Sequence, residues 1–147
     1  RNAKPLAQAI VAPRINQPLD SEDDFKGVLT KYAMRGKENR YLAQVFQAVR
    51  IEVNQELEAL SEALDQSTNL LKPGGRLVIM SYHSLEDRPV KNFIASGHVE
   101  GKVEKDFYGN VLKPLQAVNR KPIIASDKEI KENNRARSAK LRIAEKL

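Results

Sequence analysis

Most side chains that could perform chemistry stand together in the ten residues MSYHSLEDRP, Met80 to Pro89. They follow the apolar run Leu77–Ile79 and form either surface decoration or the rim of an active site. Glu86 and Asp87 are candidate catalytic groups, because a carboxylate can accept a proton in general base catalysis. As first-turn residues of a helix, the same two acids would instead stabilise the helix dipole.

The neighbouring side chains are candidates for binding a ligand. Tyr82 could stack on a nucleobase if its ring points out of the sheet core. His83 could hydrogen-bond a cofactor or a phosphate, and its alternative is a structural hydrogen bond. Arg88 could bind a phosphate, and its alternative is a salt bridge to Glu52 or Glu56.

A strand, a tight turn and a helix are predicted to hold this group in place. Lys72–Gly75 breaks the preceding helix, and residues 76–82 alternate too little for a half-exposed strand, which predicts a centrally buried one. A capping box is expected next, with Ser84 as the N-cap and Asp87 at the third helical position. This order indicates the α/β class, and in an open parallel sheet ligands bind at the carboxyl ends of the strands, here Tyr82–Ser84.

Helices are predicted through the first half of the chain. A short helix spans Pro5–Val11, and a second begins at Asp20 or Ser21 and has Gly36 as its C-cap. Apolar residues at spacings of three and four then predict one long helix, or two in line, from about Asn39 to Leu71.

Three further elements are predicted in the last third. Residues 111–118 read as an edge strand interrupted by Pro114, because a central strand would not tolerate proline. Ser126–Glu129 is a second capping box, which opens a short helix. Residues 139–144 alternate between apolar and polar, which favours a closing strand over the alternative of a terminal helix.

The chain is basic, with 25 Lys and Arg against 19 Asp and Glu, a formal net charge of +6 and a pI near 9.6. The cations are clustered, which favours RNA or DNA phosphates over a solvated surface. The candidate contacts are Arg40, Arg120, Arg135 and Arg137, joined by Arg50 and Asn54, which lie one helical turn apart and could reach the same ligand.

The amino-acid composition excludes several kinds of site. The chain has no cysteine and two histidines, which excludes disulfides and thiolate sites, gives no basis for a metal site and fits a cytoplasmic protein. No apolar stretch approaches the roughly 20 residues that cross a bilayer, so no membrane contact is expected. The sequence starts without methionine and without a signal peptide, so we expect a fragment.

Three long segments carry a resemblance to a known family: GKENRYLAQVFQAVRIEVNQELEAL, KPGGRLVIMSYHSLEDRPVKNF and RKPIIASDKEIKENNRARSAKLRIAEKL. In this order they resemble the C-terminal half of the bacterial ribosomal RNA small-subunit methyltransferase H family, also called MraW. The resemblance covers nearly the whole chain. The variants MSYHSLED and EKDFYGN resemble the Bacteroidetes branch of the family.

The resemblance implies a Rossmann-like, S-adenosylmethionine-dependent methyltransferase that modifies N4 of a cytidine in the decoding region of 16S rRNA. It implies a helical inserted subdomain at residues 1–50 and the later strands and helices of the methyltransferase domain at residues 51–147. With that substrate, Glu86 and Asp87 become candidate acceptors for the cytosine N4 hydrogens. Tyr82 becomes a candidate to stack on the extruded base.

The family's glycine-rich cofactor loop belongs to an N-terminal half that these residues do not contain. We therefore assign no cofactor-binding residue to this chain and expect it to be inactive alone. A catalytically silent RNA-binding or assembly module is the alternative function. In either case 16S rRNA or the small ribosomal subunit is the expected partner.

Two structural expectations follow from the same comparison. Pro89 replaces the family's usual aliphatic residue, and Asn134 its usual proline. Pro89 is expected to distort the first turns of its helix without abolishing it. The strand at residues 77–82 is expected to lack a neighbour and to expose an apolar edge, through which a homodimer could form.

Overall fold

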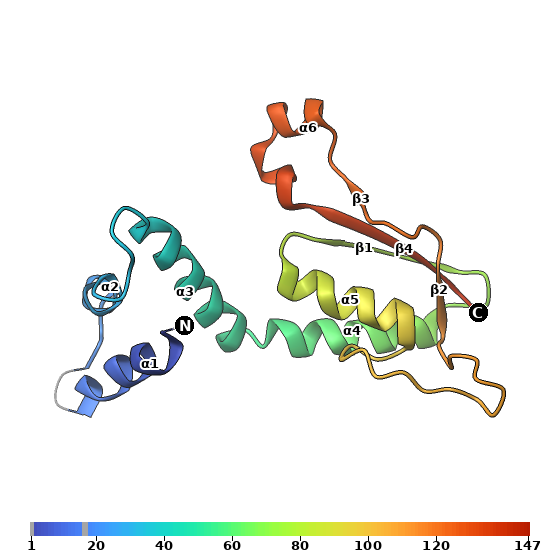
Figure 1. The fold of residues 1–147 in the computed structure, drawn as a ribbon, viewed down its shortest axis with the longest axis horizontal. Coiled ribbons are helices and arrows are strands. Elements are labelled where there is room, and N and C mark those ends of the chain that lie inside the picture. The colour runs from blue at the N-terminus through green and yellow to red at the C-terminus, as the bar shows by residue number, and fades with distance from the viewer. Residues whose placement is uncertain (1, 16–17) are drawn as a thin grey trace. The chain divides into compact units, whose positions relative to one another are not determined.

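The structure, a computed structural model, describes residues 2–15 and 18–147, and the chain divides into two compact units, Arg1–Asn54 and Gln55–Leu147. Helices are the only regular elements among the described residues of the first unit, and the second unit combines helices with an antiparallel sheet (Figure 1). The division falls slightly beyond the boundary expected after residue 50. This mixture of helix and sheet is consistent with the predicted α/β class.

The first unit is built from four helical segments: α1 (Ala3–Val11), the short 3-10 helix η1 (Pro13–Ile15), α2 (Glu22–Thr30) and α3 (Glu38–Val53). Ser21 caps α2, because its Oγ accepts the N–H of Asp24 at 3.1 Å. Leu29 is completely buried, and the rings of Phe25 and Phe46 meet edge to face at 5.6 Å, joining α2 to α3. The first two predicted helices are confirmed.

One predicted helix end is corrected. Gly36 is not the C-cap of α2, which stops at Thr30; it lies in the turn before α3 and donates its N–H to Glu38 Oε1 at 2.9 Å. Of the two alternatives for residues 39–71, one long helix or two, the structure has two, since α3 ends before Asn54 and α4 spans Glu56–Leu70. Gln55 between them has a φ of 51°, a left-handed conformation that stops a right-handed helix.

The sheet of the second unit contains β1 (Arg76–Ser81), β2 (Leu115–Ala117), β3 (Ile123–Ile124) and β4 (Lys140–Lys146). Its order is β1-β4-β2, with β3 also pairing with β4, and every pairing among the described strands is antiparallel. The expected parallel sheet is therefore wrong for these residues. The closing strand is confirmed and the terminal helix is not, and this strand lies at the centre of the sheet.

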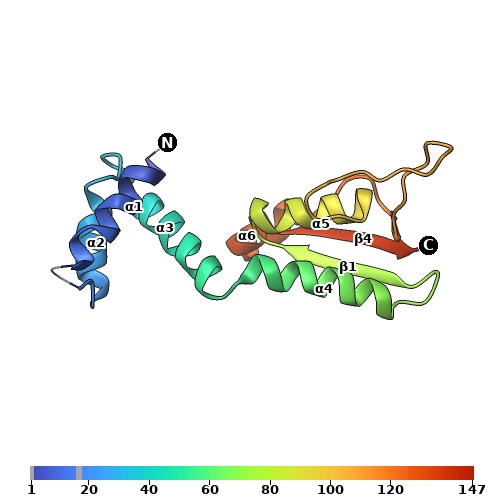
Figure 2. The same ribbon diagram turned by 90° about the horizontal axis from the view of Figure 1, so that it is seen from below.

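One face of the sheet is covered by α4 and by α5 (Ser84–Ser96), which lie side by side in both ribbon views (Figures 1 and 2). The core between these layers contains Leu64, Val90, Phe93, Ile94, Leu115 and Ala144. Leu77 and Ile79 of β1 pack against this core, whereas Val78 and Met80 on the other face are 54% and 53% exposed.

Strand β1 was expected to be centrally buried, and this expectation is wrong. Only one of its faces is covered, and β4 is its only neighbour among the described strands. Its other edge is unpaired within the described residues, as the sequence led us to expect. Self-association through that edge stays a prediction.

The remaining elements lie between β1 and β4 in sequence. Strand β2 is shorter than predicted, because it begins directly after Pro114, which has no N–H to donate. Ser126 caps α6 (Asp127–Glu132) by accepting the N–H of Glu129 at 3.2 Å, as predicted, and the 3-10 helix η2 (Asn134–Ser138) follows. Helix α5 continues through Pro89, also as predicted. Among the described residues, no helix is both long and apolar enough to cross a membrane.

The C-terminal end of α5 gives a first testable prediction. Gly97 has a φ of 80° and donates its N–H to the Phe93 carbonyl at 2.8 Å, and an added Cβ would lie 3.0 Å from Pro114 Cδ. We expect Gly97→Ala to lower the free energy of unfolding by about 1–3 kcal/mol, because it adds steric crowding to left-handed backbone strain. Chemical denaturation measures this loss.

Gly109→Ala is the matched control. Gly109 has a φ of 87°, but a Cβ there would meet no atom within 4 Å. Its substitution should therefore show the backbone strain alone. Equal losses for the two variants would show that the contact with Pro114 has no energetic weight.

Candidate functional site

The turn from β1 to α5 carries the predicted group of polar side chains. His83 has an extended backbone, with φ −144° and ψ 165°, and is the N-cap of α5; its Nδ1 accepts the N–H of Glu86 at 3.3 Å. Ser84 is the first helical residue, so its predicted role as N-cap is wrong. Asp87 is consequently the fourth helical residue. The capping pattern is real but begins one residue earlier than the sequence suggested.

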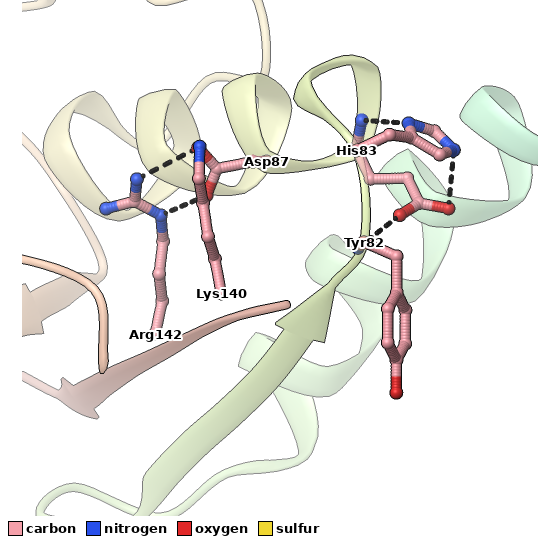
Figure 3. Close-up of polar contacts among 6 residues, drawn as sticks. Tyr82, His83, Asp87, Lys140 and Arg142 are labelled. Carbon is pink, nitrogen blue, oxygen red and sulfur yellow. Dashed lines mark hydrogen bonds and ion pairs between the residues drawn. The ribbon is translucent and has the colours of Figure 1, made fainter. Parts of the chain in front are cut away.

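Glu86 completes this capping arrangement from the third helical position. Its Oε2 accepts the backbone N–H of Tyr82 at 3.0 Å, and its Oε1 lies 2.9 Å from His83 Nε2 (Figure 3). The side chain keeps 30% of its surface exposed. A carboxylate has about four lone-pair sites. Glu86 is therefore fixed in position and retains capacity to accept a further hydrogen bond from solvent or a ligand.

The hydrogen bonds of His83 also define which ring nitrogen carries the proton. Since Nδ1 accepts the Glu86 N–H, the neutral imidazole must carry its hydrogen on Nε2. Nε2 is buried and faces the Glu86 carboxylate, although its hydrogen bond there lacks regular geometry. The Nε2–H of the neutral ring can thus point at the Glu86 carboxylate while Nδ1 keeps its capping bond.

Glu56 joins this pair from α4. One ligand atom from each of Glu56, His83 and Glu86 lies within 4.8 Å of the others. A metal ion on Nε2 would require the ring proton to move to Nδ1, which would abolish the capping bond to the Glu86 N–H. The arrangement is therefore better suited to fixing the Glu86 carboxylate than to holding a metal.

Sequence analysis did not identify Glu56 as part of this site. It was considered only as a salt-bridge partner for Arg88. No local spacing connects it to His83, and the packing of α4 against α5 is what brings the two together. The apolar residues Leu60 and Leu64, by which α4 packs in the core with α5, were the available signal.

Asp87 contacts Arg142 and Lys140, whereas Glu86 contacts His83 and the Tyr82 N–H (Figure 3). Asp87 Oδ1 accepts Arg142 Nε at 2.7 Å, and its Oδ2 accepts Arg142 Nη2 and Lys140 Nζ, each at 3.1 Å. Only 7% of the residue is exposed. The hydrogen bond from Arg142 lowers the pKa of Asp87, outweighing burial, and Lys140 lowers it further. Asp87 joins α5 to β4 and is disfavoured as a proton acceptor.

This ion pair depends on the antiparallel position of β4. Ser81 at the end of β1 is paired with Lys140 at the start of β4, and Ile79 with Arg142. Both cations consequently reach the first turn of α5. In the parallel sheet that was expected, the partner strand would have ended, not begun, at this edge.

The structure places Tyr82 away from the Glu86 and His83 pair. The residue is 54% exposed, and its ring points away from the His83 side chain (Figure 3). Tyr82 lines a cavity of about 600 Å³ together with residues of β1, β3, α6, η2 and β4, among them Arg135. Of the predicted nucleic-acid contacts, Tyr82 and Arg135 are therefore brought to one cavity.

The other predicted contacts are more scattered. Arg88 and Arg137 are exposed on α5 and η2, and Arg120 is exposed in the segment after β2. Arg40 lies on α3 of the first unit and lines a cavity of about 280 Å³ there. Arg50 and Asn54 also belong to the first unit and are one helical turn apart as predicted, since the Asn54 N–H donates to the Arg50 carbonyl at 3.0 Å.

The capping arrangement gives a second testable prediction. We expect His83→Ala to lower the free energy of unfolding by about 1 kcal/mol, because the N–H of Glu86 loses its acceptor. Ser84→Ala should cost less than half as much, since Ser84 lies inside the helix. Thermal and chemical denaturation of both variants measure the difference. A larger loss for Ser84→Ala would restore Ser84 as the N-cap.

The whole chain is similar to known proteins. The whole chain, residues 1–147, matches the family described as the MraW methylase family. A protein of Cytophaga hutchinsonii is 60% identical over 146 residues, which are 99% of this chain and 49% of that protein. Proteins of Christiangramia forsetii and Flavobacterium johnsoniae are each 54% identical over 147 residues, 100% of this chain and 48% of each of them.

All three relatives carry the name ribosomal RNA small subunit methyltransferase H. The chain spans about half the length of these curated relatives. The resemblance inferred from its three long segments is confirmed. The chain belongs to the MraW methylase family.

Proposed function

We propose that this chain is the C-terminal part of an S-adenosylmethionine-dependent methyltransferase that modifies N4 of a cytidine in the decoding region of 16S rRNA. The observation that carries the proposal is the Glu86 carboxylate, which the Tyr82 N–H and His83 hold at the end of β1 in a chain of the MraW methylase family. Carboxylates are natural acceptors for cytosine N4 hydrogens. A small-subunit substrate also implies a cytoplasmic protein.

Glu86 has a defined task in this reaction. The N4 lone pair of cytosine is delocalised into the ring, so the amine is a poor nucleophile until an acceptor draws on one of its hydrogens. As the new N4–CH3 bond forms and the S–CH3 bond of the donor breaks, one N4 proton must leave, and Glu86 accepts it. His83 keeps the carboxylate in position, since its Nε2 lies 2.9 Å from Glu86 Oε1.

S-adenosylmethionine would supply the methyl group, but the residues at this turn do not fit its binding. A nucleotide-type cradle requires a glycine-rich turn whose backbone N–H groups are open to the ligand. The turn from Tyr82 to Ser84 contains no glycine, Glu86 accepts the N–H of Tyr82, and His83 accepts the N–H of Glu86 in the first turn of α5. We therefore assign the proton acceptor and RNA contacts to this chain, and the cofactor contacts to other parts of the polypeptide.

The extruded base is assigned to the cavity of about 600 Å³ beside Tyr82. Its exposed ring can stack on a base, a contact of roughly 1–3 kcal/mol in single-strand binders, and Arg135 lines the same cavity as a cation for the phosphate. The other candidate contacts, Arg88 and Arg137, are exposed on α5 and η2 of the second unit. Arg40, Arg50 and Asn54 offer RNA contacts from the first unit.

The two units are assigned different roles. The helical unit is the inserted subdomain, and the unit with the sheet is the later part of the methyltransferase domain. The free edge of β1 and its exposed outward residues, Val78 and Met80, suit a further strand and covering helix from the same polypeptide. Pairing with a second copy is the alternative use of this edge.

The proposed function is tested with the complete polypeptide, small ribosomal subunits that lack the modification, and S-adenosylmethionine with a labelled methyl group. Mass spectrometry of the digested nucleosides should find the label in N4-methylcytidine. Label in 5-methylcytidine, or RNA binding without any transfer, would overturn the assignment. The second outcome would favour the silent RNA-binding module, for which the basic charge of the chain is the supporting observation.

A further inference from the structure

A small basic cavity lies in the second unit, on the side of α5 that faces the segments around β2 and the strand β4. Its volume is about 270 Å³. Four cationic side chains line it, and its remaining lining is aliphatic apart from one asparagine. The cations are Lys91 from α5, Lys113 and Arg120 from the two sides of β2, and Arg142 from β4.

Three of these four cations have no acid partner within the part of the chain that the structure describes. Lys91, Lys113 and Arg120 have no ion pair among the described residues, and no acid lines the cavity. Arg142 uses Nε and Nη2 to hold Asp87. Figure 3 shows its third nitrogen pointing away from that carboxylate. The cavity therefore concentrates positive charge in a concave site.

The turn that carries Arg120 is held in place. The Asn119 side-chain amide lines the same cavity and donates to the Lys121 carbonyl at 2.8 Å, which closes the backbone around Arg120. The aliphatic lining includes Ile94, which is 6% exposed and belongs to the core. The site thus combines four cationic side chains with an apolar side chain of the core.

We propose that this cavity binds one phosphate of an RNA backbone together with part of its ribose, as an RNA contact additional to Tyr82 and Arg135. The inference rests on the proposed function in that it takes RNA as the substrate. The cavity is smaller than the roughly 300–1,000 Å³ of typical small-molecule sites, so it suits a backbone group better than a whole cofactor.

The charge and the shape of the cavity decide among three possible ligands: S-adenosylmethionine, a lipid surface and a phosphate. S-adenosylmethionine carries a sulfonium, an ammonium and one carboxylate, so its net positive charge would be repelled here. A lipid surface is planar and favours cations on a flat or protruding face, whereas these four surround a hollow. A tetrahedral phosphate, with several oxygens to share among converging Lys and Arg side chains, fits both the charge and the shape.

The test uses the complete polypeptide and a fluorescent RNA hairpin from the small-subunit decoding region. Binding is measured by anisotropy over a series of salt concentrations for the wild type and for Lys113→Gln/Arg120→Gln. We expect the variant to bind about tenfold more weakly, with a log–log salt slope smaller by about 0.7 to 0.9, because one phosphate is no longer neutralised. Arg120→Lys, which keeps the charge, should retain most of the slope.

The matched control is Lys26→Gln/Lys102→Gln, which removes the same charge from two lysines that already have acid partners, Glu22 and Glu100. Its slope should change by less than half as much. Equal slopes for all variants, or equal losses in the two double variants, would overturn the proposal. Anionic vesicles serve as a second probe, and a loss confined to them would assign the cavity to lipid instead. If circular dichroism shows that the double variant is misfolded, the single variant Arg120→Gln tests the phosphate site instead. Arg120 is exposed, so its substitution should not disturb the fold.

The two proposals fail separately. If the wild-type polypeptide forms N4-methylcytidine but the Lys113 and Arg120 variants keep the full salt slope, only the phosphate site is wrong. If the slope falls as expected but no methyl group is transferred, the cavity is an RNA site and the proposed reaction is wrong.

Discussion

Replacing Glu86 by glutamine in the complete polypeptide is expected to lower the single-turnover rate of methylation by about 10²-fold while leaving the fold intact. The glutamine amide can still accept the Tyr82 N–H through its oxygen, so the turn keeps its shape. It cannot take a proton from the cytosine amine. Rapid-quench measurement with saturating RNA and methyl donor isolates this chemical step from binding.

Asp24→Asn is the matched control for Glu86→Gln. Asp24 is the third residue of α2, as Glu86 is of α5, and it also contributes to an N-cap, by accepting the Ser21 hydroxyl at 2.6 Å. If Glu86 merely stabilises a helix dipole, both variants should lose a few tenths of a kcal/mol and keep full turnover. An unchanged rate for Glu86→Gln would place the proton acceptor elsewhere in the polypeptide.

Asp87→Asn is expected to have the opposite effect, a loss of stability of about 3 kcal/mol with an unchanged rate per folded molecule. Asp87 is almost fully buried and binds two cations of β4, and its amide would leave Arg142 and Lys140 without a counter-charge. Urea denaturation of the wild type and the variant measures the loss. A change below about 0.5 kcal/mol would show that this ion pair does not join α5 to the sheet.

The pH dependence of the same pair follows from the lowered pKa of Asp87. The ordinary value is 3.8, and the hydrogen bonds from Arg142 and Lys140 place the folded value below it. The unfolded chain therefore takes up the proton first as the pH falls, and the stabilisation is present above pH 3.8 and lost as the pH drops through the folded value. The stability difference between the wild type and Asp87→Asn should accordingly be constant near neutral pH and shrink below about pH 4.

Local patterns predicted the elements of the fold well where the chain's own periodicity determined them. The helices at Pro5–Val11 and after Ser21, the cap at Ser126 and the closing strand were visible in spacing and capping residues. The break at Gln55 was not, because the apolar stripe continues at helical spacing on both sides of it. A single left-handed residue that is not glycine leaves no mark in such a pattern.

The site was predicted in its composition but not in its partners. The sequence grouped Glu86 with Asp87, yet the two acids differ by one position on a helix, so they project about 100° apart and meet different elements. Asp87 faces β4, whose antiparallel return beside β1 brings Arg142 and Lys140 to it. Glu86 faces His83. Only tertiary packing could distinguish a structural acid from a candidate proton acceptor.

The dependence on tertiary structure also explains two wrong predictions, the burial of β1 on both faces and the N-cap of α5 at Ser84. An apolar run predicts burial, but how many faces are covered depends on neighbours that a single strand does not specify. Histidine is an uncommon N-cap, so the sequence pointed to Ser84 as the N-cap of α5. The N-cap is His83, because its backbone is extended and the helix begins after it. The family resemblance came from long segments and was independent of these local details.

The most direct test of this account compares Glu86→Gln with Asp87→Asn in one experiment, with the single-turnover rate of N4-cytidine methylation normalised to the folded fraction of each variant. The account predicts a rate about 10²-fold lower for Glu86→Gln at nearly wild-type stability, and a wild-type rate for Asp87→Asn at markedly lower stability. The reverse pattern, with full turnover in Glu86→Gln and lost turnover in folded Asp87→Asn, would contradict it.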